Sequence, residues 1–245
     1  MNILLPACGL GTRFSDAGFD KPKPLIDING KSMIARALGR WKRDNVIVIK
    51  RKYDDRWHNN AMAIETVGCR TIEIDYVTEG AACTCLLAKE YINNDDELLI
   101  ADCDAFYKED IYWFIDKYIR SDTRIDSCGI VFHHDTPKNS YVKVDDDGWA
   151  IETAEKKVIS NLSFTGMHWF RKGKYFVEAA EAMIAANDRT NGEFYVSPCY
   201  NYLLKQGRNM KPLLIPNSWV TQVGTPPDLV NYLNRELLRD ENVPY

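Results

Sequence analysis

A short apolar run that breaks into a glycine-rich turn, close to the start of the chain, constrains the fold more than any other feature. Residues 2–34 read NILLPACGLGTRFSDAGFDKPKPLIDINGKSMI, with the apolar run at residues 3–6. Gly9 and Gly11 remove side chains where the chain must turn tightly, so that backbone N–H groups can converge on an anion. We therefore predict a strand that opens into a phosphate-binding loop.

Two cations close to this loop strengthen the prediction. The planar guanidinium of Arg13 matches phosphate oxygens, and Lys23 supplies a compact point charge. Pro22 and Pro24 fix the backbone on both sides of Lys23, which reduces the entropy lost in presenting its ammonium group. Other glycine loops fit poorly, because a dinucleotide-binding loop would need a third glycine at Phe14 and a P-loop would need Gly-Lys-Ser/Thr.

Strand and helix patterns alternate through the first half of the chain. Continuous apolar runs indicate buried strands, and apolar residues three or four positions apart indicate helices. The predicted strands cover residues 3–6, 46–49, 71–77 and 98–101, and the predicted helices cover residues 33–41 and 111–119. This alternation predicts an α/β fold, a Rossmann-like mixed and mainly parallel sheet flanked by helices, with ligands at the carboxyl ends of the strands.

The second half of the chain is richer in strands. Strands are predicted at residues 128–132, 141–144, 149–153 and 164–170, a hairpin turn at 145–148, and an amphipathic helix over 176–184. The C-terminal helix begins with Thr225 as N-cap, Pro226 at the first helical position and Asp228 three residues after the cap. No proline- or glycine-rich linker divides the chain. We predict one domain, 1–245, with a nucleotide-binding half at about 1–125, an acceptor-binding half at about 126–225 and a C-terminal helix at about 226–240.

Composition excludes several classes of protein. The formal net charge is −4 and no cluster of lysines and arginines stands out, which argues against a nucleic-acid partner. No apolar run approaches the roughly 18 residues of a membrane span, and the first residues read as a core strand, so we expect a cytoplasmic protein without a membrane partner. The seven cysteines form no Cys-x-x-Cys pair and most lie among apolar neighbours, which indicates reduced core thiols rather than a zinc site.

Two carboxylates follow the predicted strand at residues 98–101. In the sequence LLIADCD, Asp102 and Asp104 stand where a parallel sheet presents its ligands. Carboxylate oxygens at this place suit Mg²⁺, which keeps several waters and bridges phosphates rather than filling an all-protein cage. Since Asp104 could instead cap the next helix, Asp102 is the stronger candidate ligand.

GLGTRF followed by KPKPLIDINGKSMI resembles the opening signature of the sugar-nucleotide pyrophosphorylase, or nucleotidyltransferase, family. The resemblance implies a fold of the nucleotide-diphospho-sugar transferase type and a loop that wraps the triphosphate of a nucleotide. It implies that Arg13 faces the departing pyrophosphate, that Lys23 holds the α-phosphate and that Asp102 binds the catalytic metal. The loop residues that it assigns to the nucleotide are Pro6, Ala7, Cys8, Gly9, Leu10, Gly11 and Thr12.

The resemblance continues near the C-terminus, with one departure. SWVTQVGTPPDL has the Gly-Thr-Pro pattern of the family but places Gln222 where the family has a second metal-binding aspartate. Either Gln222 ligates the ion through its carbonyl oxygen, or Asp104 replaces the missing carboxylate. The sequence leaves both alternatives open.

Further segments resemble the substrate-binding parts of the family. In TEGAACTCLLA, Gly80 and Ala81 would let a base approach the backbone, while Glu79 would accept hydrogen bonds from its edge. In AEKKVISNLSFTGMHWF, Glu155 would hold sugar hydroxyls and Lys156 the acceptor phosphate, although a lysine follows where the family usually has proline. The acceptor-binding residues implied in this way are Asp104, Glu155, Lys156, Gly166 and, from NGEFY, Glu193.

The expected function is nucleotidyl transfer. A phosphorylated acceptor, with a sugar 1-phosphate as the leading choice, attacks the α-phosphate of an NTP in the presence of Mg²⁺ and expels pyrophosphate without a covalent intermediate. One alternative is a cytidylyltransferase for a non-sugar phosphate such as choline phosphate. Others are a glycosyltransferase of related fold with an Asp-x-Asp metal site, and a nucleotide-binding regulatory protein, which the departure at Gln222 favours. A homo-oligomer is compatible with the sequence, which names neither the base nor the acceptor.

Overall fold

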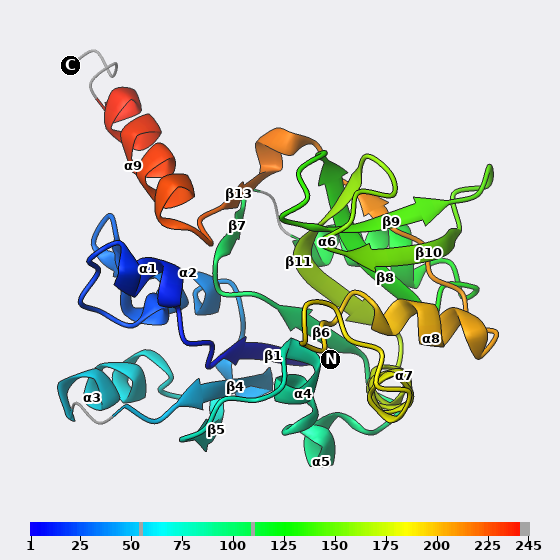
Figure 1. Ribbon diagram of the computed structural model, residues 1–245, viewed down its shortest axis with the longest axis horizontal. Coiled ribbons are helices and arrows are strands. Elements are labelled where there is room, and N and C mark those ends of the chain that lie inside the picture. Colours follow the sequence, from blue (N-terminus) through cyan, green and yellow to red (C-terminus); the bar gives the residue numbers. More distant parts are fainter. Residues whose placement is uncertain (54–55, 109–110, 241–245) are drawn as a thin grey trace.

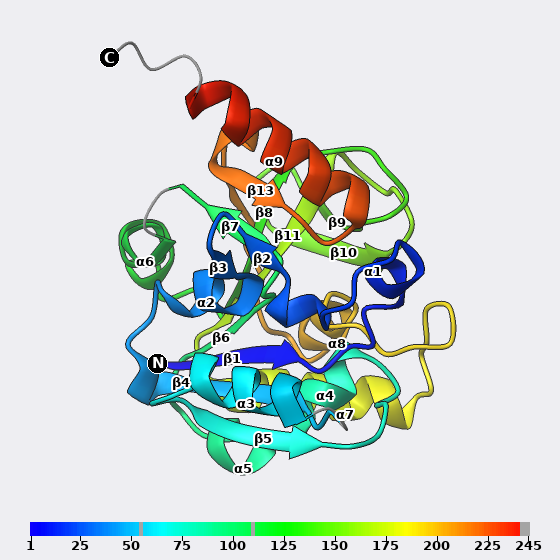
Figure 2. The same cartoon turned by 90° about the vertical axis from the view of Figure 1, so that its left-hand side faces the viewer.

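A nine-stranded mixed sheet runs through the molecule, with helices against both of its faces (Figures 1 and 2). The computed structural model describes residues 1–53, 56–108 and 111–240. Within these ranges the strand order is β10-β9-β11-β6-β1-β4-β5, with β8 beside β11 and β12 beside β8. The predicted α/β fold with a mixed central sheet is therefore confirmed.

Parallel pairing builds the first half of the sheet. β1 lies between β4 and β6, and β5 extends the sheet beyond β4. Residues on both faces of β1, β4 and β6 are buried, because helices cover both faces, and this explains their continuous apolar runs. The strands of this half are β1 (Asn2–Ala7), β4 (Val46–Arg51), β5 (Arg70–Ile74) and β6 (Leu98–Ala101).

Antiparallel pairing builds the second half. β11 runs antiparallel to β6, β8 and β9, so it joins this half to the parallel strands. Its pairing with β8 is irregular between Phe164 and His168, and Gly166 lies within that irregular stretch. The strands of this half are β8 (Ser127–His133), β9 (Ser140–Val144), β10 (Ala150–Glu155), β11 (Leu162–Phe170) and β12 (Leu213–Leu214).

Two hydrophobic clusters fill the space between the sheet and the helices. One cluster includes side chains of α2 (Met33–Leu38) and α3 (Arg56–Glu65), and the other includes side chains of α4 (Ala81–Leu86), α5 (Lys89–Ile92) and α7 (Gly173–Ala185). The remaining elements are α1 (Thr12–Asp16), η1 (Lys23–Leu25), β2 (Asp27–Ile28), β3 (Lys31–Ser32), η2 (Arg43–Asn45), β7 (Ala105–Tyr107), α6 (Ile111–Phe114), η3 (Ile115–Arg120), α8 (Cys199–Lys205), η4 (Asn217–Trp219), β13 (Val220–Gln222) and α9 (Pro226–Asp240).

Several predicted boundaries differ from the structure by one to three residues, as at β5, β10 and α2. β5 ends at Ile74 rather than at residue 77, because the chain then leaves the sheet and residues 77 and 78 line a cavity. β10 begins at Ala150 rather than Trp149, because the Trp149 N–H donates to Asp145 Oδ1 (2.8 Å) and belongs to the turn. α2 ends at Leu38, three residues before the predicted end.

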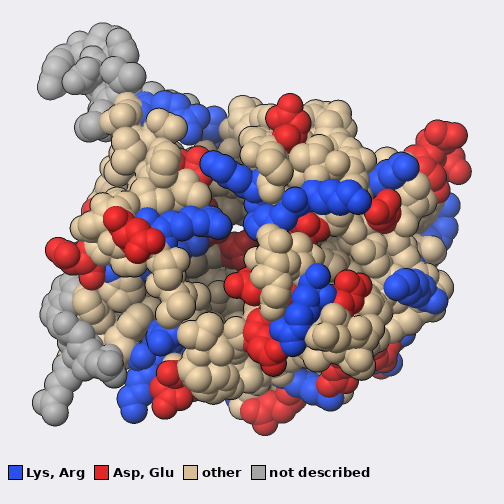
Figure 3. Space-filling model, viewed as in Figure 1, with Lys and Arg blue, Asp and Glu red and all other residues tan. Residues whose placement is uncertain are grey.

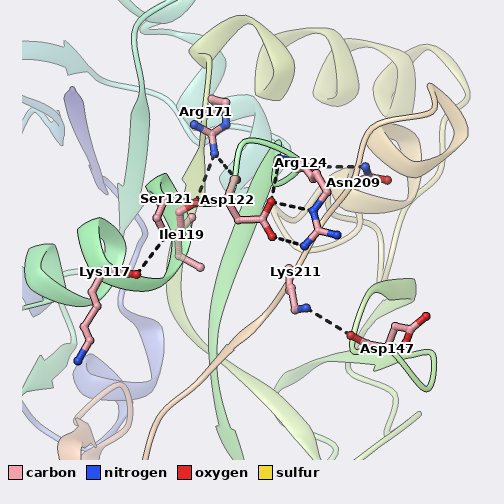
Figure 4. A network of polar contacts seen from close by, with 9 residues as sticks. All are labelled: Lys117, Ile119, Ser121, Asp122, Arg124, Asp147, Arg171, Asn209 and Lys211. Carbon is pink, nitrogen blue, oxygen red and sulfur yellow. Dashed lines mark hydrogen bonds and ion pairs between the residues drawn. The ribbon is translucent and has the colours of Figure 1, made fainter.

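The helix predicted over residues 111–119 is α6 followed by η3, which has π-helical geometry. Arg171, just after β11, stabilises its end, as Figure 4 shows. The Arg171 guanidinium donates to the backbone carbonyls of Ile119 (3.3 Å) and Asp122 (2.8 Å). Arg124 in turn donates to the Asp122 carboxylate (2.6 and 2.9 Å). This network fastens the end of η3 to the sheet on the outside of the molecule.

Two further predictions concern the cysteines and the C-terminal helix. All seven cysteines are free thiols, and five of them are buried, as expected for core residues. The Asp228 N–H donates to Thr225 Oγ1 (3.4 Å), and Thr225 Oγ1 also contacts the Asp228 carboxylate, so the predicted cap of α9 is confirmed. Among the described residues, no helix has the length and apolar character needed to cross a membrane.

His168 should make the fold sensitive to acid. Its ring is buried and stays neutral at physiological pH, because burial lowers its pKa from 6.5 to about 3. Tyr200 Oη lies 3.1 Å from His168 Nδ1 and donates to the Cys128 carbonyl (3.1 Å), so the neutral ring donates to Tyr200. Below about pH 6.5 the unfolded chain binds a proton at this residue while the folded chain does not. The free energy of unfolding therefore decreases as the pH is lowered. The contribution of His168 to the free energy of unfolding should fall by about 2 kcal/mol between pH 7 and pH 5.

Urea unfolding at several pH values tests this prediction. His168→Gln keeps a side-chain donor but does not titrate. The difference in free energy of unfolding between His168→Gln and the wild type should therefore shift by about 2 kcal/mol in favour of the variant between pH 7 and pH 5. His133→Gln is the matched control, because His133 is exposed on β8. Equal acid sensitivity in the wild type and His168→Gln would contradict the assignment.

Candidate active site

Two adjoining cavities open where β1 and β6 end. The first, of about 470 Å³, is lined by residues 6–14 and by part of the segment that leads into α4. The second, of about 340 Å³, lies against β11 and the start of α9. Figure 3 shows the molecule hollowed near the middle of its face, between its two halves. The residues that line both cavities are Arg13, Lys23, Ala81, Asp102, Tyr195 and Gly224.

The predicted phosphate loop lines the first cavity along its whole length. Gly11 has a left-handed backbone (φ 65°) and is the N-cap of α1, and its carbonyl accepts from the Phe14 N–H (2.9 Å). A Cβ on Gly11 would lie only 3.0 Å from the Cβ of Lys23, so glycine is needed both for the turn and for this packing. Phe14 is buried against Phe19, whereas Arg13 lies on the cavity side.

Asp102 sits at the junction of the two halves. Its backbone N–H donates to the Gly166 carbonyl (3.0 Å), and its carboxylate occupies the space that a Cβ on Gly166 would need. Gly166 also has a positive φ of 93°. The missing side chain of Gly166 makes room for Asp102, and its predicted role in acceptor binding stays a prediction.

Asp104 has a similar position on the other side of the shared wall. Its carbonyl accepts from the Val223 N–H (2.8 Å), and a Cβ on Gly224 would lie 2.7 Å from its carboxylate. The Lys23 ammonium forms an ion pair with Asp104 Oδ2. Asp104 is followed by a short strand, β7, and not by a helix. The alternative that Asp104 serves only to cap a helix is therefore excluded.

The charges of these groups depend on one another. The Asp102 carboxylate reaches solvent in the cavity, but the protein around it and the Asp104 carboxylate raise its pKa to about 7. Burial alone would lower the pKa of Lys23, but Asp104, with smaller contributions from Cys103 and Asp102, raises it above its usual value. Lys23 therefore stays protonated, while Asp102 can gain or lose a proton near neutral pH.

Gln222 lies close to these carboxylates. β13 pairs with β7 so that Gln222 faces Ala105, the residue after Asp104. The side chains of Gln222, Asp102 and Asp104 all line the second cavity. No group of three or more His, Cys, Asp or Glu side chains in the described ranges could by itself hold a metal ion. A cation at this wall would need oxygen atoms from substrate or water.

The segment after β5 is held by the loop that precedes α8. Gly80 and Ala81, for which base contacts are predicted, line the first cavity. Gly80 has φ 131°, and a Cβ there would overlap the backbone of Phe194, so only glycine allows this approach. Glu79 does not line either cavity. Its exposed carboxylate forms an ion pair with Arg189, and its contact with the edge of a base stays a prediction.

Four of the five predicted acceptor residues line the second cavity: Asp104, Glu155, Lys156 and Gly166. Glu155 is almost enclosed, accepts from Ser197 Oγ (2.7 Å) and pairs with Lys156 Nζ (3.0 Å). These contacts show that the two charges are not an exposed surface pair. Glu193 differs, because it lines the first cavity rather than the second.

Sequence reasoning missed several residues of the site. Tyr195 lines both cavities. Its position two residues after Glu193 in NGEFY is the sequence feature that could have identified it as a site residue. Thr78 and Thr84 line the first cavity and share a hydrogen bond between their hydroxyls (2.6 Å). Lys138 and Ser197 line the second cavity, and no motif marked them.

An α/β sheet with a phosphate loop, two carboxylates at a strand end and an adjoining polar cavity defines a nucleotide-dependent transferase of the nucleotide-diphospho-sugar transferase fold. The family model described as Nucleotidyl transferase matches residues 2–237. The chain therefore belongs to the nucleotidyl transferase family and is a nucleotidyltransferase. This membership decides against a glycosyltransferase of related fold.

Two curated relatives align along nearly the whole chain. UTP–glucose-1-phosphate uridylyltransferase AglF of Haloferax volcanii is 24% identical over 93% of this chain and 93% of its own length. The bifunctional protein GlmU of Methanocaldococcus jannaschii is 27% identical over 97% of this chain, but the match covers 54% of GlmU. This chain thus corresponds to about half of that larger protein.

Solved structures agree on the fold. The nucleoside-diphosphate-sugar pyrophosphorylase of Vibrio cholerae RC9 superposes with a TM-score of 0.77 at 24% identity, covering 95% of this chain and 99% of its own. The inositol-1-phosphate CTP transferase of T. maritima superposes with a TM-score of 0.72 at 15% identity, covering 100% and 98%. Both likenesses concern the fold.

Gly166→Ala should disable the site with little effect on the rest of the fold. Its methyl group would displace the Asp102 carboxylate, and a displacement of about 1 Å near reacting atoms can lower the rate about 100-fold. Gly207→Ala is the matched control, because Gly207 also has a positive φ (75°) but nothing lies near its missing Cβ. Pyrophosphate release and melting temperature should be measured for both variants. Similar activity in the two would show that the Asp102 position does not depend on Gly166.

Proposed function

We propose that this nucleotidyltransferase transfers the NMP group of an NTP to a phosphorylated small molecule, with a sugar 1-phosphate as the preferred acceptor. The observation that carries the proposal is that the phosphate loop and the Glu155–Lys156 pair line separate cavities that meet at Asp102, Lys23 and Arg13. A nucleotide in the first cavity and an acceptor in the second would bring their phosphates together at this shared wall.

The reaction needs positioning and charge compensation rather than a protein nucleophile. An oxygen of the acceptor phosphate forms a bond to the α-phosphorus, and the bond from that phosphorus to the bridging oxygen of the β-phosphate breaks. The electron pair leaves with pyrophosphate, so no proton transfer is required. In this arrangement Lys23 holds the α-phosphate, Arg13 stabilises the pyrophosphate, and Lys156 orients the acceptor phosphate.

The shared wall fits a hard divalent cation, and we propose Mg²⁺. Asp102 and Asp104 supply charged oxygens and Gln222 a neutral one, from two elements that face the same cavity. When bound, Mg²⁺ would neutralise charge on the α-phosphate and the acceptor. Gly166 and Gly224 have no Cβ, so they leave room for the carboxylates of Asp102 and Asp104.

The names of the relatives support a sugar phosphate as the acceptor of this protein but do not identify which sugar it carries. AglF is named for UTP and glucose 1-phosphate, and the Vibrio cholerae protein for nucleoside-diphosphate sugars. The second cavity also suits hydroxyl groups, because polar side chains such as Asn139, Ser140 and Thr165 line it. A non-sugar phosphate is the alternative that the acceptor panel below would reveal.

Incubation with each NTP, Mg²⁺ and a panel of sugar 1-phosphates and other small phosphates, monitored for pyrophosphate, tests the proposal. We expect product with at least one NTP and acceptor pair. Lys23→Ala should lower that rate by about 10²- to 10³-fold, because a charged contact to the transition state is lost. Near-normal rates in Lys23→Ala, or release of NDP from a sugar nucleotide in place of pyrophosphate from an NTP, would overturn the proposal.

Gln222 provides a test of the metal site. A carboxylate binds Mg²⁺ more tightly than a neutral amide does, so Gln222→Asp should lower the Mg²⁺ concentration for half-maximal rate, and Gln222→Ala should raise it. Mn²⁺ binding measured by electron paramagnetic resonance should shift in the same directions. Identical metal titrations in both variants and the wild type would place Gln222 outside the metal site and leave Asp104 as the second ligand.

A further inference from the structure

The ion pair between Lys23 and Asp104 joins two groups that the proposed function needs for different partners. Lys23 Nζ contacts Asp104 Oδ2, and the two side chains are 24% and 21% exposed. A carboxylate oxygen that holds an ammonium group is not available to a metal ion. In the same way, the ammonium group in this pair is held by a carboxylate rather than by a phosphate.

The backbone positions both partners, and one of them is better able to move. The Asp104 side chain is short, its carbonyl accepts from Val223, and its carboxylate packs against Gly224. The backbone of Lys23 is fixed by Pro22 and by close packing against Gly11. Beyond its Cβ, however, Lys23 has a flexible four-carbon stem. A rearrangement of the pair would therefore move the lysine.

The surroundings of Lys23 offer the ammonium group a second partner. Lys23 lines the first cavity together with the phosphate loop, and it lines the second cavity together with the carboxylates. In the free protein one ammonium group faces two carboxylates. A divalent cation beside these carboxylates would compensate their charge and repel the ammonium group, while a polyphosphate on the loop would attract it.

We infer that substrate binding exchanges the partners of this ion pair: a divalent cation takes the Asp104 carboxylate, and the released Lys23 ammonium group takes a phosphate of the nucleotide. The inference rests on the proposed function for the identity of the two ligands. Its consequence is that metal and polyphosphate bind cooperatively, because each one removes the competitor of the other.

Inorganic tripolyphosphate is a suitable probe, since it needs no knowledge of the base. Isothermal titration calorimetry should measure its affinity in EDTA and in Mn²⁺. In Asp104→Asn, Lys23 is no longer held, so tripolyphosphate should bind about tenfold more tightly in EDTA, and the advantage given by Mn²⁺ should shrink by at least the same factor. An Asp104 that only supports the fold would weaken binding equally under both conditions, which would overturn the inference.

Two controls separate exchange from general electrostatics. Glu181→Gln removes the acid of the exposed Lys89–Glu181 pair, away from both cavities, and should change neither affinity. In a Lys23→Gln background, Asp104→Asn should no longer tighten tripolyphosphate binding in EDTA, because the effect acts through Lys23. If the tightening persists there, simple repulsion by Asp104 explains it and the exchange is wrong.

Binding of Mn²⁺ alone tests the other half of the exchange and does not require the nucleotide site. By electron paramagnetic resonance, Lys23→Gln should bind Mn²⁺ about tenfold more tightly than the wild type. The gain should exceed that of Arg13→Gln, since Lys23 forms the ion pair with Asp104 and Arg13 is another cation that lines both cavities. The double variant Lys23→Gln, Asp104→Asn should lose this gain. Unchanged Mn²⁺ affinity in Lys23→Gln would overturn the exchange. Failure of the wild-type protein to bind tripolyphosphate would instead overturn the proposed function.

Discussion

The two carboxylates that follow β6 repel each other, and much of the site holds them together in spite of that repulsion. Desolvation by the surrounding protein and the neighbouring Asp104 carboxylate raise the pKa of Asp102 to about 7. Lys23 compensates part of this charge from the phosphate loop side, and Gly166 and Gly224 give each carboxylate the space it occupies. The loop, β11 and β13 therefore meet at one place, because each contributes a charge, a glycine or a hydrogen bond to the same pair of acids.

The change from parallel to antiparallel pairing decides where this meeting point lies. β6 pairs in parallel with β1 and antiparallel with β11, so its carboxyl end lies next to both the phosphate loop and Gly166. The first cavity thus lies mainly against the parallel half and the second against the antiparallel half. Asp102, at the end of the shared strand, is one of the residues that line both.

The departure at Gln222 changes how the metal site would be built. With aspartates at both positions, two strands would each supply one carboxylate, whereas here both carboxylates come from the segment between β6 and β7. β13 keeps its place beside β7 and contributes an amide and the glycine that clears room for Asp104. In the free protein the Asp104 carboxylate pairs with the Lys23 ammonium group.

The sequence by itself determined the α/β fold, the glycine turn after β1, the two acids after β6 and the cap of α9, because these depend on local periodicity, glycine, proline and short-range spacing. The positions of Glu79 and Glu193, the room that Gly166 makes for Asp102 and the Lys23–Asp104 pair were decided only by the tertiary structure. Lys138 was likewise unmarked, since no local motif distinguishes it. The physical reason is that these contacts join residues far apart in the chain, and their distances are set by strand register and packing between the two halves.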